Sequence, residues 1–160
     1  MINASRILIG FLIIFSIDAY AQSFTYKDIP IQNHGRIKPL DTFANNQLLS
    51  IYGKTKFEKI KSIDWLFELL TMSPISLDQR IFKIENPDVI HSLALIWRKP
   101  HLYTFKEIRA ALYENETLIN SIKNKLKNEN NKLELVENQI WHLYQNKVLF
   151  ENIFKSTTCL

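Results

Sequence analysis

The sequence predicts a mainly α-helical protein, in which short helices pack with a long C-terminal heptad-patterned helix and there is little or no β-sheet. Glycine is scarce, with 3 in 160 residues, which disfavours the tight turns that a many-stranded sheet requires. Helix-start signals recur along the chain. The C-terminal third carries apolar residues seven apart, a spacing typical of a helix that packs along one face.

Residues 1–21 have the order of a secretory signal peptide. Arg6 precedes an apolar run, Ile7–Ile17, and a small-x-small pattern ends at Ala21, as at a cleavage site. The run is shorter than the roughly 20 residues that cross a bilayer. We therefore expect export, cleavage, and a single soluble periplasmic helical domain over residues 22–160. The alternative is a membrane anchor formed by an uncleaved signal.

Residues 22–40 read as an extended segment. Pro30 donates no ladder hydrogen bond, so this stretch cannot be a central strand. Asn33-His34-Gly35 is a turn signal, and the proline after Lys38 keeps Lys38 out of helical geometry. Arg36 and Lys38 are two residues apart, which places both side chains on one side of an extended chain.

Residues 41–113 are expected to form short helices. Asp41 or Thr42 would cap the first of them, which ends at about Tyr52, with Gly53 just beyond its C-terminus.

Further helices of this region also have recognisable starts or stops. We expect one over about 63–72, buried through Trp65 and stopped by Ser73-Pro74. Asn86-Pro87 would begin another, because asparagine caps and proline suits the first helical position. Thr104 and Glu107 fit a capping box at the start of a fourth. Residues 81–84 favour a strand.

The heptad pattern predicts one long helix over 114–155. One row contains Leu112, Ile119, Leu126, Leu133 and Ile140, and a companion row contains Ile122, Val136, Leu143 and Phe150. The polar patch 128–131 weakens this helix, and folding back at that patch is the alternative. In a single straight helix, an apolar stripe of Leu126, Leu133, Val136 and Ile140 would be too large to leave exposed. We therefore predict that these four residues bind a partner or a second copy of the chain.

Composition argues against several classes of function. The net charge of +4 comes from bases scattered among acids, so nucleic-acid binding is not expected. Cys159 is the only cysteine, which excludes a disulfide within the chain and the C-x-x-C-H haem-attachment motif. No nucleophile or pair of carboxylates has catalytic spacing, and we expect no enzymatic activity.

The four histidines, His34, His91, His101 and His142, show no metal-binding spacing, so we expect no metal site. A single histidine can still bind haem iron. His34 is the weak candidate for that role, because it lies in a turn beside Arg36 and Lys38, whose charges suit haem propionates.

One segment is distinctive enough to support a comparison by family. It contains Pro30, Gln32, Gly35, Arg36, Lys38, Pro39, Leu40, Asp41, Thr42 and Ala44. This pattern resembles the P-V-Q-x-G-G-R-x-K-P-L-D-T-x-A signature of the extracytoplasmic domain of fused system II cytochrome c synthases, the ResB/CcsA type. Weaker similarities follow in the same order at 65–67, 82–87 and 103–105. His34 stands where that family has glycine, and the tryptophan-rich haem-handling signature is missing.

The resemblance implies an accessory or split-off periplasmic part of a cytochrome c maturation system rather than the synthase itself. Its implied partner is a CcsA-type membrane protein or apocytochrome c, and haem would be reached only through a partner. In the elbow from Arg36 to Asp41, Arg36 and Lys38 would meet haem propionates or an acidic partner loop, or would brace the fold. The rival hypothesis is a generic periplasmic interaction protein that associates through its C-terminal amphipathic helix.

Overall fold

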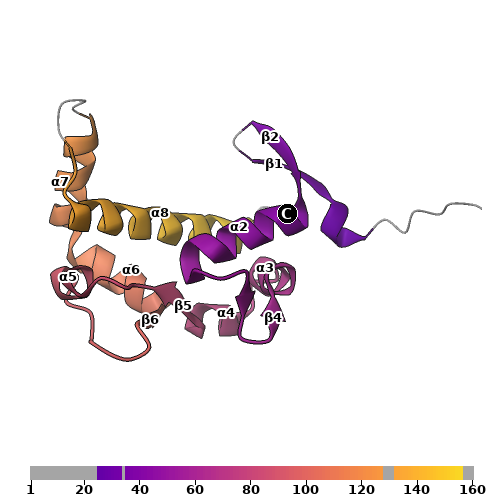
Figure 1. The fold of residues 1–160 in the computed structure, drawn as a ribbon, viewed down its shortest axis with the longest axis horizontal. Coiled ribbons are helices and arrows are strands. Elements are labelled where there is room, and N and C mark those ends of the chain that lie inside the picture. The colour runs from indigo at the N-terminus through magenta and orange to yellow at the C-terminus, as the bar shows by residue number, and fades with distance from the viewer. Residues whose placement is uncertain (1–24, 34, 128–131, 157–160) are drawn as a thin grey trace, which may run out of the picture.

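A computed structural model describes residues 25–33, 35–127 and 132–156. Within these residues, 62% are helical, in seven α-helices and one short 3-10 helix, and small two-stranded hairpins accompany them (Figure 1). The fold class expected from the sequence is therefore confirmed. The expected signal peptide, His34 and Cys159 lie outside the described residues, as does the polar patch 128–131.

The elements follow one another in three groups. The first contains η1 (Tyr26–Asp28), β1 (Pro30–Asn33), β2 (Arg36–Pro39) and α2 (Leu40–Tyr52). The second contains β3 (Lys56–Phe57), β4 (Ile60–Lys61), α3 (Ser62–Leu70), α4 (Pro74–Asp78) and β5 (Arg80–Lys83). The third contains α5 (Pro87–Ser92), β6 (Leu102–Thr104), α6 (Phe105–Glu114), α7 (Glu116–Lys127) and α8 (Leu135–Lys155). Antiparallel pairs form between β1 and β2, β3 and β4, and β5 and β6.

Two helix starts are those expected from the sequence. The Asn86 side chain accepts a hydrogen bond from the Asp88 N–H at 2.9 Å, and Pro87 is the first residue of α5. Thr104 and Glu107 form the reciprocal capping box at the start of α6. Each of these caps satisfies backbone N–H groups that have no partner within the helix.

The start of α2 differs from the prediction that Asp41 or Thr42 caps it. The helix begins at Leu40, and Pro39 occupies the cap position without a side-chain hydrogen bond. The Leu40 N–H donates to the Ile29 carbonyl at 2.8 Å, so the strand pairing takes the place of a side-chain cap. Asp41 lies in the first turn and accepts a hydrogen bond from Asn45.

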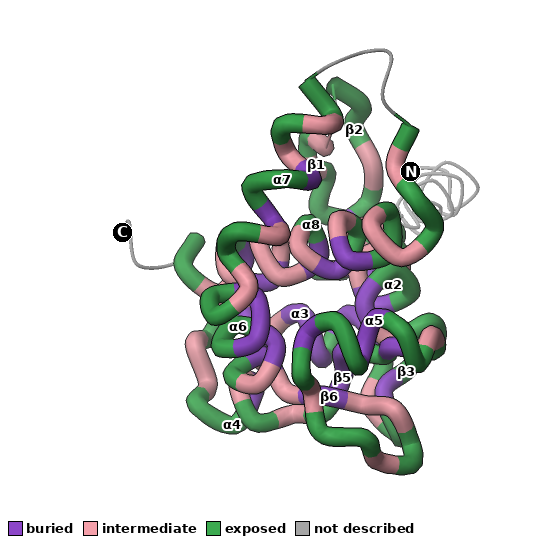
Figure 2. The backbone as a smooth tube through the Cα atoms, turned by 90° about the vertical axis from the view of Figure 1, so that its left-hand side faces the viewer, coloured by how far each residue is buried: buried purple, intermediate pink, exposed green. Residues whose placement is uncertain are grey.

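The core is built around large side chains that come from most parts of the chain. Trp65, Phe82, Tyr103 and Phe150 are all fully buried. Phe150 of α8 stacks on Phe105 with a centroid separation of 4.8 Å and also contacts Phe82 at 5.5 Å. Figure 2 shows the buried positions concentrated between α8 and α2 on one side and α3, α6 and the β5–β6 pair on the other.

The prediction of one helix over 114–155 is wrong. Helix α6 ends before Asn115, α7 ends at Lys127, and α8 begins at Leu135 after an extended residue, Glu134. Helix α7 packs against α8, and an ion pair links Lys125 to Glu137. Most residues of the apolar rows are thereby buried inside the protein, so the heptad pattern reflects packing within the chain. Leu126 is the exception at 43% exposed, and Leu133 and Val136 are partly buried.

At the opposite end of α8 from α7, the β1–β2 hairpin projects from the body of the protein, and its base contacts α2 (Figure 1). Within the described part of the chain, no helix combines the length and apolarity needed to cross a membrane.

Candidate functional site

Residues 30–44, which contain the distinctive sequence motif, fold as the β1–β2 hairpin followed by the first turns of α2. The hairpin register pairs Pro30 with Pro39, Ile31 with Lys38, Gln32 with Ile37 and Asn33 with Arg36. The hydrogen bond from Leu40 to Ile29 extends this ladder. Hydrogen-bonded and non-hydrogen-bonded pairs alternate along an antiparallel ladder. Pro30 and Pro39 form a non-hydrogen-bonded pair, so the ladder requires no N–H from either residue. Both free edges then carry a proline, which disfavours pairing with a further strand.

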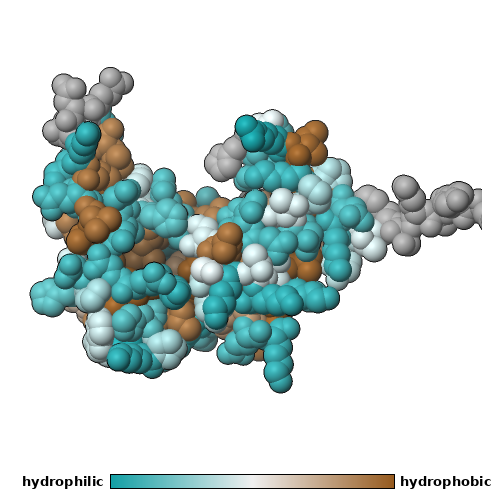
Figure 3. Space-filling model, in the orientation of Figure 1, coloured by the Kyte–Doolittle hydropathy of each residue, from teal (hydrophilic) through white to brown (hydrophobic). Residues whose placement is uncertain are grey.

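The two faces of the hairpin differ in exposure. Pro30, Gln32, Ile37 and Pro39 form one face and are all exposed, with Ile37 at 78%. Ile31, Asn33 and Lys38 lie on the other face and are half-buried. In the space-filling view the hairpin is a separate projection on which an apolar patch adjoins polar side chains (Figure 3). The hairpin therefore presents an apolar outer face to its surroundings.

Arg36 and Lys38 lie on the same face, as the sequence predicted, but their contacts differ. The Lys38 Nζ donates to the Asn33 Oδ1 at 3.0 Å across the two strands. Arg36 is exposed, and neither an ion pair nor a hydrogen bond joins its side chain to any residue that the structure describes. Lys38 therefore helps to hold the hairpin together, and the Arg36 guanidinium is available to another molecule.

The base of the hairpin is fixed in the core. Leu40 is 8% exposed and Ala44 is fully buried, so the first turn of α2 cannot tilt freely. Gly35 adopts φ of +73°, a left-handed conformation that glycine takes at little cost. The direction of the Arg36 strand is thus set by the packing of α2 and by the glycine at the turn.

The four residues predicted to form an exposed partner stripe do not form one. Ile140 is 1% exposed and belongs to the core, and Leu133 and Val136 pack against the core while partly buried. Only Leu126 of the four is exposed, at 43%. The physical reason is that α8 packs against α3, α5, α6 and α7, which cover its apolar residues.

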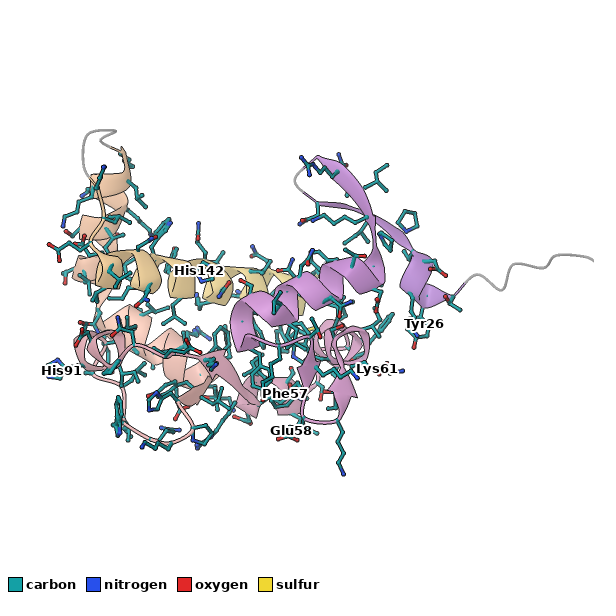
Figure 4. All side chains as sticks on the ribbon, in the orientation of Figure 1. Tyr26, Phe57, Glu58, Lys61, His91 and His142 are labelled. Carbon is teal, nitrogen blue, oxygen red and sulfur yellow. The ribbon has the colours of Figure 1, made fainter. Side chains whose placement is uncertain are left out.

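The described histidines lie on separate elements. His91 is exposed on α5, His142 lies on α8, and the two are well apart in Figure 4. His101 packs against Trp97 with ring centroids 4.3 Å apart, and its buried Nε2 has no partner within the described structure. Among the described residues, no group of three or more His, Cys, Asp or Glu is placed to hold a metal ion.

A polar network that the sequence reasoning missed joins α2 to α8. Asn146 is only 7% exposed. Its Oδ1 accepts from the Ser50 hydroxyl at 2.8 Å, and its Nδ2 donates to the Ser50 carbonyl at 2.9 Å. These two bonds fix the amide orientation, and the Nδ1 of His142 lies 3.3 Å from Nδ2. The sequence did contain a signal for this network, because Asn146 falls between Leu143 and Phe150 on an apolar face.

The Ser50 carbonyl is one of the last carbonyls of α2, which receive no hydrogen bond from an N–H of the same helix. Asn146 therefore caps the C-terminus of α2 from another helix. A groove of about 500 Å³ opens beside this network, bordered by α8, the end of α2 and residues 83–86. Asn86 and Gln139 close part of it through a hydrogen bond of 2.7 Å. Asn146 is bonded to Ser50 and Asn86 to Gln139, so these side chains connect neighbouring elements and have a structural role.

Comparison with models of known protein families, with curated proteins and with solved structures gives no match for this chain. A function for the chain therefore rests on the residues of the hairpin segment and on their geometry.

Proposed function

We propose that this chain is an accessory or split-off periplasmic part of a cytochrome c maturation system and works beside a CcsA-type membrane protein. The observation that carries the proposal is the position of Arg36, which is exposed and has no partner among the described residues, on a hairpin whose base is anchored by Leu40 and Ala44. This hairpin is also the segment in which the resemblance to the family is concentrated.

The chemistry of the site suits a carboxylate-bearing partner. A guanidinium binds a carboxylate through two parallel hydrogen bonds, which fixes geometry as well as charge. Such carboxylates are present in an acidic loop of a partner protein and in the propionates of a haem that a partner holds. Arg36 would bind them, while Lys38, which is bonded to Asn33, would keep the hairpin closed.

The outer face of the hairpin supports a protein as the direct partner. Pro30, Ile37 and Pro39 are exposed side by side in the register. An apolar patch is typical of the centre of a protein–protein interface. A partner that reaches from this patch around the two-stranded hairpin would meet Arg36 on the opposite face. The prolines at both edges favour recognition through side chains over addition of a strand.

The rival function, association through the C-terminal helix, is less well supported by the packing. Ile140 is in the core, and Leu133 and Val136 already pack against it. An interface built on these residues would require α8 to leave the other helices.

The proposal is tested by deleting the coding sequence in the cell that encodes it and measuring covalently bound haem in c-type cytochromes. We expect that haem to fall and to return with the wild-type gene. A photo-crosslinking residue at Ile37 should capture a multispanning membrane protein, whereas the same residue at exposed Glu114 on α6 should not. Unchanged cytochrome haem in the deletion strain would contradict the proposed function.

A further inference from the structure

A second surface feature lies away from the hairpin, where α6, α7 and α8 meet. Figure 2 shows α7 above α8 and α6 below it at this end of the molecule. The three helices border a groove of about 690 Å³, within the range of roughly 300–1,000 Å³ typical of ligand sites. Leu112 and Ile119 lie along it and are 5% and 3% exposed. They give the groove an apolar floor.

Cationic side chains outnumber acidic ones around this floor. Lys106, Arg109, Lys123 and Lys147 line the groove, against two carboxylates, Glu116 and Glu151. The lining therefore has an excess of positive charge, which attracts an anionic ligand.

The internal pairing of these charges decides which cations are free. Glu151 accepts hydrogen bonds from Lys147 at 2.6 Å and Lys155 at 2.8 Å, which lower its pKa to about 2. Lys106 forms an ion pair with Asp78 at 2.7 Å. Arg109, in contrast, is exposed and has no ion pair or hydrogen bond with any residue in the described ranges. It is the cation best placed to take a new carboxylate.

Aromatic side chains complete the groove. The Lys123 ammonium lies 4.7 Å from the centroid of the Tyr144 ring, an attractive cation–π arrangement, and it has no carboxylate partner in the described structure. Tyr113, one turn beyond Arg109 on α6, is 79% exposed. Exposed tyrosine beside arginine is a combination enriched where proteins bind one another.

We propose that this groove binds a peptide segment of a partner protein in which acidic residues flank an apolar side chain. The apolar side chain contacts Leu112 and Ile119, and the acidic residues meet Arg109 and Lys123. The inference does not depend on the proposed role of the hairpin, because it uses different residues.

The test is an array of random heptapeptides probed with the labelled full chain. We expect retained peptides to be enriched in Asp and Glu on both sides of an apolar residue. Arg109→Gln should weaken binding of such a peptide about three- to tenfold, the effect expected for one charge-assisted bond at a rim. Arg80→Gln removes the same charge from an exposed position outside the groove, and this control should bind like the wild type.

Three outcomes would overturn the inference. One is an array with no acidic enrichment, or with no retained peptide. A second is equal weakening by Arg109→Gln and Arg80→Gln, which would indicate general attraction to a basic protein. The third is Arg109-dependent binding to phosphatidylglycerol vesicles without binding to the acidic peptides, which would assign the groove to a lipid surface.

Discussion

Replacing Asn146 by alanine tests whether one side chain of α8 secures the end of α2. The change deletes the bond from the Ser50 hydroxyl to Oδ1 and the bond from Nδ2 to the Ser50 carbonyl. That carbonyl then loses its cap, since the helix itself supplies no donor at its C-terminus. We expect the folded state to be destabilised without a change of fold.

The magnitude follows from the two hydrogen bonds and their surroundings. Each contributes about 0.5–1.5 kcal/mol net. Ser50 is exposed, so water replaces part of what is lost, whereas the nearly buried Asn146 site leaves a small void. The sum is a loss of roughly 1–3 kcal/mol in the free energy of unfolding, and each kcal/mol lowers Tm by about 3–5 °C in a domain of this size.

The assay is urea unfolding of the wild type and of Asn146→Ala, Ser50→Ala and the double variant. Ser50→Ala removes only the hydroxyl bond, so it should lower the free energy of unfolding by about 0.5–1 kcal/mol. The double-mutant cycle should show that its effect is not additive with that of Asn146→Ala. Asn138→Ala is the matched control, because Asn138 is an exposed amide on the same helix. An Asn146→Ala variant within about 0.5 kcal/mol of the wild type would refute the capping role.

Two further predictions concern the C-terminal helices. Ile140→Asp should unfold the protein, because it places a carboxylate in the core. Leu126→Asp, at a 43% exposed position, should change the free energy of unfolding by less than about 1 kcal/mol. Circular dichroism of both variants tests this, and a folded Ile140→Asp protein would contradict the packing. The pKa of Glu151 is lowered from 4.5 to about 2 by hydrogen bonds from Lys147 and then Lys155. Because the pKa of Glu151 is lower in the folded state, its ionised carboxylate stabilises the folded protein at pH values above the unfolded-state pKa. This contribution is lost as the pH falls from 4.5 toward about 2. Glu151→Gln should therefore be less stable than the wild type by about 0.5–1 kcal/mol near neutral pH and should match it near pH 2. A stability difference that does not shrink on acidification would count against these ion pairs.

Local signals predicted the parts of the fold that depend on neighbouring residues. Asn86 and Thr104 cap helices through atoms two or three residues away, so the sequence alone was sufficient to place those starts. Trp65 was expected in the core and is fully buried. The start of α2 was missed because its first N–H is satisfied by Ile29, whose pairing depends on the hairpin register.

Features that depend on distant residues could not be predicted in the same way. The heptad rows identified buried positions such as Ile119 and Ile140, but periodicity does not say whether a face meets a partner chain or another helix of the same chain. The sequence also could not predict that the Arg36 side chain has no partner among the described residues. Recognition of another molecule by Arg36 and a structural role for it in the fold were therefore equally open. The groove beside Arg109 combines three helices, and no single stretch of sequence contains it.

We propose that Arg36 recognises a partner during cytochrome c maturation. The most direct test of this role replaces chromosomal Arg36 by alanine and measures, in the same cells, covalent haem in c-type cytochromes together with the Tm of the purified protein. Arg80→Ala serves as the exposed arginine control. We predict lost maturation with a Tm within about 2 °C of the wild type. Normal maturation in Arg36→Ala, or maturation that declines only as Tm declines, would contradict the claim.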